Sequence, residues 1–142
     1  MKKTTLLIII MYAMLGACQS GDDFDKMPRS IMQFVTQYWP NPAVSQCQEN
    51  DDGSWLVQIK SGPTLTFDAE ENWTSVNGNG VPLPQVLLFD RLPSALYDYL
   101  ESGGYLGQVF DMSRTAREIT LQLHTSRLYY VIDTGEIRQE HQ

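Results

Sequence analysis

The segment Trp55-Leu56-Val57-Gln58-Ile59 and the segment Leu65-Thr66-Phe67-Asp68, which follows it across Ser61-Gly62, decide the class of fold. In an extended chain Val57 and Ile59 fall on the same face, as they do in a strand with one buried side. The Ser-Gly pair between the two segments is typical of a turn. Together the segments predict an antiparallel hairpin that lies on a hydrophobic core.

The same pattern returns 64 residues further along the chain. Ile119-Thr120-Leu121-Gln122-Leu123 corresponds to the first segment, and Tyr130-Val131-Ile132-Asp133 follows a turn at Thr125-Ser126 and corresponds to the second. Each hairpin is expected to continue into a last short strand, around Trp73 and around Ile137. A chance likeness between two amphipathic units is the alternative to an internal repeat.

A helical pattern precedes each hairpin. The first opens at Met27-Pro28 and the second at Leu92-Pro93, 65 residues later. Proline suits the first helical turn because its missing N–H has no partner inside the helix there. Both patterns repeat apolar residues at helical spacing, namely Ile31, Val35, Tyr38, Leu96 and Leu100. Pro40 should end the first helix, and Gly103-Gly104 the second.

The sequence therefore predicts an α+β fold built as a tandem repeat, in which each unit is a helix followed by a three- to four-stranded antiparallel sheet. The first unit spans residues 27–80. Residues 81–142 hold a linker helix, expected to begin near Leu83-Pro84, and then the second unit. A unit of roughly fifty residues buries little apolar surface alone, so the two units are expected to pack together or pair their sheets around a shared core. The sequence leaves both arrangements of the sheets open.

The order of these motifs resembles the PepSY-like family of Bacteroidetes lipoproteins, which is described as β-lactamase-inhibitor-like. In that family a Leu-Pro opens a helix, an aromatic-Pro ends it, and hairpins carry Gly-x-x-x-x-Phe-Asp followed by Trp. The matching stretches here are Met27-Pro28, Tyr38-Trp39-Pro40, Gly62 to Asp68, Trp73, Leu83-Pro84, Leu92-Pro93, Tyr99-Leu100 and Tyr129 to Asp133.

The resemblance implies the architecture of β-lactamase inhibitor proteins, a tandem repeat whose concave sheet face grips a partner protein. The paired cysteines of that inhibitor are absent here, and none of its contact side chains can be placed on this sequence. The resemblance therefore implies a fold and a mode of binding, and it does not imply inhibition of a β-lactamase.

The N-terminus has the three parts of an export signal. Lys2 and Lys3 are followed by the ten-residue apolar run from Leu6 to Leu15, which is too short to span a membrane. The stretch Leu15-Gly16-Ala17-Cys18 resembles the lipobox of bacterial lipoproteins. It implies that residues 1–17 are removed and that Cys18 is acylated and anchors the chain to the membrane. A cleavable signal without lipidation is the alternative.

Residues 18–26 read as an acidic tether with too little apolar surface to fold alone. Gln19 follows the cysteine in place of the aspartate that retains lipoproteins at the inner membrane, and this favours the outer membrane. The cluster Asp22, Asp23 and Asp25 resembles the export signal of surface lipoproteins. Display at the cell surface and a periplasm-facing anchor both remain open.

Composition excludes some classes of partner. Loss of residues 1–17 removes Lys2 and Lys3, so the net charge falls from −7 to −9. Such a chain lacks the basic surface that binds nucleic acid. With Cys18 acylated, no disulfide framework is expected.

The sequence has few candidate catalytic residues, and we expect a protein that is not an enzyme. His124 and His141 are the only histidines, and no His-Glu-x-x-His motif occurs. Cys47 and His124 could serve as nucleophile and base, but a buried cysteine and a solvated histidine are the simpler reading. Asp51-Asp52-Gly53 lacks the ligand spacing of a calcium loop and reads as a turn. We expect no catalytic residue, metal site or cofactor.

Aromatic side chains outside the core are the candidates for partner binding, because Tyr and Trp are enriched at the centres of interfaces. Trp55, Phe67 and Tyr130 are expected to fill the core, whereas Tyr97 and Tyr129 are expected to point outward. A partly buried surface tyrosine with no function is the alternative.

The leading hypothesis is a non-enzymatic, outer-membrane-anchored module that binds an envelope protein. The second is a receptor for a small molecule, peptide or glycan in a groove between the repeats. A third, suggested by the resemblance alone, is an inhibitory or chaperone-like role toward a secreted peptidase.

Overall fold

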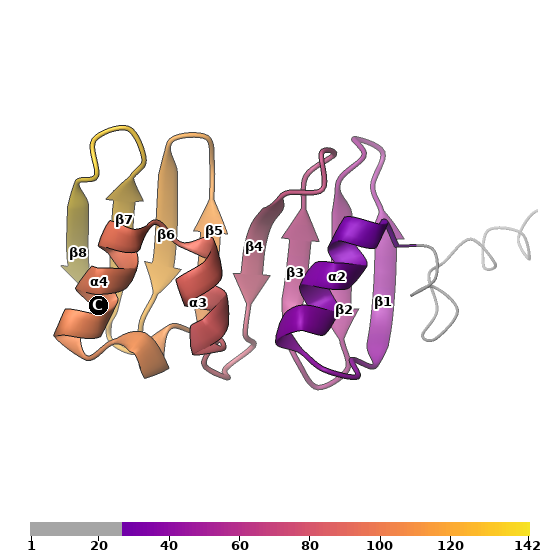
Figure 1. Ribbon diagram of the computed structural model, residues 1–142, viewed down its shortest axis with the longest axis horizontal. Coiled ribbons are helices and arrows are strands. Elements are labelled where there is room, and N and C mark those ends of the chain that lie inside the picture. Colours follow the sequence, from indigo (N-terminus) through magenta and orange to yellow (C-terminus); the bar gives the residue numbers. More distant parts are fainter. Residues whose placement is uncertain (1–26) are drawn as a thin grey trace, which may run out of the picture.

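The computed structural model describes residues 27–142, so the predicted signal peptide, Cys18 and the acidic tether lie outside the described residues. Eight strands form one antiparallel sheet in the order of the chain, from β1 to β8, and Figure 1 shows them side by side. The strands are β1 (Val44–Glu49), β2 (Trp55–Ile59), β3 (Thr64–Phe67), β4 (Trp73–Asn77), β5 (Asp111–Arg114), β6 (Glu118–Gln122), β7 (Ser126–Val131) and β8 (Ile137–His141).

The helices all cover the same face of this sheet (Figure 1). Helix α2 (Arg29–Tyr38) precedes β1 and lies in front of β2 and β3. Helices α3 (Gln85–Arg91) and α4 (Ser94–Gly103) and the 3-10 turn η2 (Leu106–Gln108) connect β4 to β5 and cover the other half. Within residues 27–142 no helix combines the length and the apolar character needed to cross a membrane.

The predicted tandem repeat with a β-lactamase-inhibitor-like architecture is wrong. Strand β4 pairs directly with β5, from Ser75 opposite Ser113 to Asn77 opposite Asp111, so the chain has one eight-stranded sheet and not two smaller ones. The two halves also differ, because one helix precedes β1 while two helices and a 3-10 turn precede β5. The physical reason for the continuous sheet is the backbone: pairing β4 with β5 satisfies N–H and C=O groups that two separate sheets would leave at open edges.

The predicted helix starts are confirmed. Pro28, Pro84 and Pro93 each directly precede a helix, and their carbonyls accept the first hydrogen bonds from Met32, Leu88 and Tyr97. Helix α2 ends at Tyr38, just before Trp39-Pro40, as expected. Helix α4 stops at Gly104, whose φ of 75° lies in the left-handed region that glycine reaches at little cost.

One continuous core lies between the sheet and the helices. Strand residues alternate, so Val57, Leu65, Met112 and Leu121 point toward the helices and are fully buried. Phe67 and Tyr130 lie in this core, as predicted. Trp55 packs against its border and is only partly buried. The opposite face of the sheet carries mainly polar side chains, as is usual for an antiparallel sheet with one layer of helices.

Candidate binding groove and sheet face

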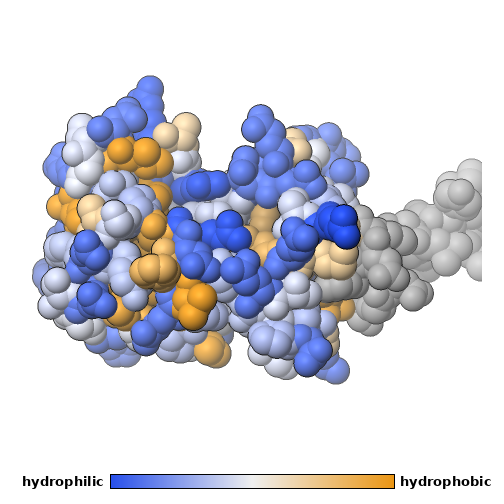
Figure 2. All heavy atoms as spheres, in the orientation of Figure 1, coloured by the Kyte–Doolittle hydropathy of each residue, from blue (hydrophilic) through white to orange (hydrophobic). Residues whose placement is uncertain are grey.

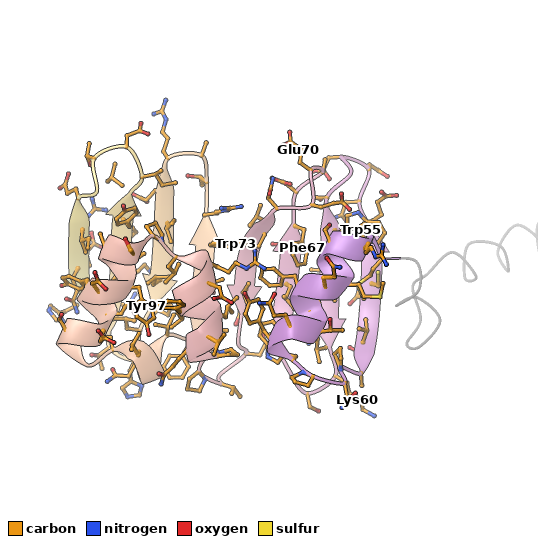
Figure 3. The ribbon with its side chains drawn as sticks, in the orientation of Figure 1. Trp55, Lys60, Phe67, Glu70, Trp73 and Tyr97 are labelled. Carbon is orange, nitrogen blue, oxygen red and sulfur yellow. The ribbon has the colours of Figure 1, made fainter. Side chains whose placement is uncertain are left out.

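A groove of about 610 Å³ lies where α2 and α3 diverge above β4. Its walls come from α2, from the end of α3, from the turn between β3 and β4 and from β5. The lining residues that matter here are Phe34, Trp73, Arg91 and Arg114, with Glu70, Glu71 and Asp90 also on the wall. Figure 2 shows hydrophilic surface over this junction, and Figure 3 places Trp73 on β4 with Glu70 at the turn.

Arg91, the last residue of α3, is held by two aromatic rings of α2. Its guanidinium carbon lies 4.6 Å from the ring centroid of Phe34 and 5.6 Å from that of Tyr38. Its Nε donates a 3.0 Å hydrogen bond to the Tyr38 hydroxyl. These contacts fix the plane of the guanidinium, because the ring quadrupole attracts the cation and the hydrogen bond sets its rotation.

The Tyr38 hydroxyl connects Arg91 to Asp90. It donates a 2.8 Å hydrogen bond to Asp90 Oδ2, which also accepts one of 3.2 Å from Gln37 Nε2. Burial, and next the hydrogen bond to Asp90, raise the pKa of Tyr38 above its usual value. The phenol therefore stays protonated and acts as a donor to Asp90 and an acceptor from Arg91.

Arg114, which also lines the groove, is held in a similar way. Its guanidinium carbon lies 4.5 Å from the ring centroid of Trp73, and its Nε donates a 2.7 Å hydrogen bond to the Trp73 carbonyl oxygen. Arg114 belongs to β5 and Trp73 to β4. The contact therefore crosses the seam where the two halves of the sheet join.

Neither arginine is paired with a carboxylate inside the described part of the chain. Among residues 27–142 the one ion pair within 4.0 Å joins Arg138 to Glu140, at 3.4 Å. The groove thus combines two guanidinium groups with three carboxylates on its walls, and the guanidinium groups are oriented by neutral partners.

The predicted binding residues lie on opposite sides of the sheet. Tyr97 is on α4, in the helical layer, where its ring meets Phe89 edge to face at 5.2 Å between centroids. Phe89 is 66% exposed, and Figure 2 shows a hydrophobic patch over α3. Tyr129 is on β7, on the face without helices, and the Arg138 guanidinium lies 4.4 Å from its ring centroid. The structure does not bring Tyr97 and Tyr129 into one site.

Tyr129 belongs to a row of side chains that crosses the whole open face of the sheet. The register places one residue from each strand in this row: Gln48, Leu56, Thr66, Ser75, Ser113, Thr120, Tyr129 and Arg138. Short hydroxyl side chains fill the middle, and Tyr129 and Arg138 are the largest members at one end. At this end of the row a partner can contact an aromatic ring and a cationic group side by side.

The geometry does not assemble a Cys–His pair. Cys47 is buried on β1, whereas His124 is exposed after β6, and four strands lie between them. Asp52 sits in a structural turn, as predicted, because its carboxylate accepts hydrogen bonds from the backbone and hydroxyl of Ser54. Residues 27–142 contain no group of three or more His, Cys, Asp or Glu that could hold a metal ion.

Sequence reasoning missed Arg91 and Arg114. Their ring partners lie far away in the chain, so no local spacing reveals the contacts. The one signal in the sequence was the small number of basic residues in an acidic chain. The structure places two of them in one groove.

No family model and no curated protein matches this chain. Solved structures that share its fold include three Bacteroides proteins. A protein of the DUF2874 family from Bacteroides vulgatus, provisionally described as periplasmic, has a TM-score of 0.69 and 18% identity, over 83% of this chain and 93% of that one. A Bacteroides thetaiotaomicron protein, provisionally described as calcium-regulated and periplasmic, has a TM-score of 0.70 and 20% identity, over 87% and 96%.

The third is a protein of unknown function from Bacteroides vulgatus, provisionally described as periplasmic, with a TM-score of 0.67 and 16% identity, over 85% of this chain and 97% of that one. At such identities the likeness shows a common fold. The resemblance to the PepSY-like family is not confirmed by these comparisons.

Proposed function

We propose that this chain is a non-enzymatic binding module of the bacterial cell envelope, held at the outer membrane by an acylated Cys18. Four observations support the proposal. The stretch Leu15 to Cys18 resembles a lipobox. The solved structures with this fold come from proteins described as periplasmic. The sequence also lacks a recognisable catalytic motif, and its motif order resembles the PepSY-like lipoproteins.

The partner is a protein that docks on the open face of the sheet. The observation that carries this assignment is the stacked pair of Tyr129 and Arg138, which stands on a face that no helix covers. Tyrosine and arginine are enriched among the residues that dominate binding energy, and short polar neighbours such as Ser113 and Thr120 add complementarity at little cost in entropy. A protein surface is the partner that can use so extended a face.

A crosslinked pull-down from native envelopes with the full lipoprotein tests this proposal. We expect one stoichiometric envelope protein, captured equally by the wild type and by Tyr97→Ala, and lost from Tyr129→Ala. A Cys18→Ala variant identifies captures that depend on anchoring. Undiminished capture by Tyr129→Ala would show that the open face is not the binding surface.

A receptor for a small molecule, peptide or glycan is the second candidate, and the groove between α2 and α3 favours it. Its volume of about 610 Å³ is within the range of ligand sites in proteins. Thermal shift against cell-wall fragments, short peptides and glycans tests this role, because a ligand that binds only the folded state raises its melting temperature. One neighbour is provisionally described as calcium-regulated; within residues 27–142 no three His, Cys, Asp or Glu side chains are grouped so that they could hold a metal ion.

A further inference from the structure

We propose that the groove between α2 and α3 binds the carboxylate of a peptide through Arg91 and Arg114, which both line it. The inference deepens the second candidate function and is independent of the open sheet face. Both arginines line the same groove although one ends a helix and the other belongs to a strand. Arginine is the side chain best suited to carboxylate recognition, because its planar fork matches the two carboxylate oxygens.

The two guanidinium groups are held in place before any ligand arrives. Arg91 is fixed by the rings of Phe34 and Tyr38, and Arg114 by the ring of Trp73. In both side chains the hydrogen bond within the described residues uses Nε, toward the Tyr38 hydroxyl or the Trp73 carbonyl. The terminal nitrogens retain donors for a ligand. A side chain that is already ordered loses less entropy when it binds.

The charges around the groove select a carboxylate over a phosphate. Glu70, Glu71 and Asp90 lie on the same walls as the two arginines. A doubly charged phosphate would be repelled by these three groups, whereas a single carboxylate faces less repulsion and is matched by two guanidinium groups. Asp90 accepts hydrogen bonds from Tyr38 and Gln37, and it does not form an ion pair with Arg91 among the described residues.

The presence of both acidic and basic side chains around the groove also indicates a peptide as the source of the carboxylate. Glu70 and Glu71 are exposed on the turn between β3 and β4. A ligand that carries N–H donors or positive charge beside its carboxylate satisfies both signs, and peptides do so. The carboxylate comes either from a peptide C-terminus or from an acidic side chain within a protein, and the two sources share one chemistry at the groove.

Calorimetric titration of the full lipoprotein in detergent tests this inference. The probes are an N-acetylated trialanine with a free C-terminal carboxylate, the same peptide as its amide, and an amidated N-acetyl-Ala-Glu-Ala with its Gln counterpart. We expect saturable binding of at least one carboxylate probe and weaker binding of its neutral partner. Binding of the free acid alone assigns a C-terminus, and binding of the Glu peptide alone assigns a side chain.

Variants separate the site from a general charge effect. Arg91→Gln and Arg114→Gln should each weaken carboxylate binding roughly 10- to 100-fold, since each removes hydrogen bonds to a charged group. Arg117→Gln removes the same charge from an exposed turn outside the groove and should leave the affinity unchanged. Arg91→Lys and Arg114→Lys keep the charge but lose the planar fork, so they should also bind the carboxylate more weakly. These lysine variants provide the test if the glutamine variants fold poorly.

The inference is overturned if no carboxylate probe binds the folded protein, or if the groove variants bind as well as Arg117→Gln. Inorganic phosphate that binds more tightly than every peptide carboxylate would also overturn it. These outcomes are distinct from those of the pull-down, which depends on Tyr129. Loss of the pull-down with retained carboxylate binding would remove only the sheet-face proposal.

Discussion

The Arg114 side chain lies over the Trp73 ring, 4.5 Å from its centroid, and donates a 2.7 Å hydrogen bond to the carbonyl oxygen of that same residue. The two residues are on β5 and β4, the strands whose pairing turns two groups of four strands into one sheet. One side chain therefore reinforces the seam of the fold and forms a wall of the candidate groove.

Removal of Arg114 should destabilise the protein. Arg114→Ala loses a cation–π contact and a hydrogen bond from a charged donor, and we expect the free energy of unfolding to fall by about 2 kcal/mol. Urea denaturation followed by tryptophan fluorescence measures the change. The exposed Arg117→Ala should change stability by less than about 0.5 kcal/mol. Equal effects of the two substitutions would contradict a special role for the seam contact.

The hydroxyl of Tyr38 should contribute to stability separately from its ring. Tyr38→Phe keeps the ring beside Arg91 but removes the hydrogen bonds to Asp90 and from Arg91. We expect a loss of about 1–2 kcal/mol, because partners in a half-buried network are left unsatisfied. Tyr129→Phe is the matched control, since its hydroxyl makes no hydrogen bond among the described residues. A loss no greater than that of the control would count against the network.

Asp111 should make stability depend on pH. Burial raises the pKa of its carboxyl, and the nearby charge of Arg127 only partly opposes this. The folded state therefore binds the proton more tightly than the unfolded state does. Stability falls as pH rises from the ordinary pKa of 3.8 through the raised value, and the cost persists at neutral pH.

Asp111→Asn should consequently stabilise the protein at neutral pH, and the gain should vanish below the ordinary pKa of the carboxyl. Urea unfolding at neutral and at acidic pH provides the test. Asp98→Asn, on the exposed side of α4, controls for the loss of one negative charge. A gain that is the same at both pH values would show that burial of Asp111 is not its cause.

The continuous sheet should unfold as a unit. Val76 on β4 and Met112 on β5 are opposite each other at the seam, and both are fully buried. Met112→Ala should lower the free energy of unfolding by about 2–5 kcal/mol through the cavity it leaves. Calorimetry should record one transition that shifts as a whole. Two transitions, of which Met112→Ala shifts only one, would indicate that the halves unfold independently.

Much of the local structure followed from the sequence. Prolines at 28, 84 and 93 mark helix starts, because proline has no N–H and the N–H groups at a helix start have no partner inside the helix. The alternation of apolar residues along β2 and β6 marks the buried face of the sheet. The likeness of the two halves nevertheless led to a wrong architecture. The alternation of apolar and polar residues identifies the buried face of a strand, but it does not identify the strand with which it pairs.

The sequence by itself determined the helix starts, the turns, the core-facing residues and the outward position of Tyr129. Only the tertiary structure decided that β4 pairs with β5, that Tyr97 and Tyr129 lie on opposite sides, and that Arg91 and Arg114 share a groove. The reason is physical. Helix caps and alternation depend on neighbours along the chain. Backbone pairing uses groups that almost every residue carries, and the hydrogen bonds that hold the two groove arginines join residues 41 or more positions apart.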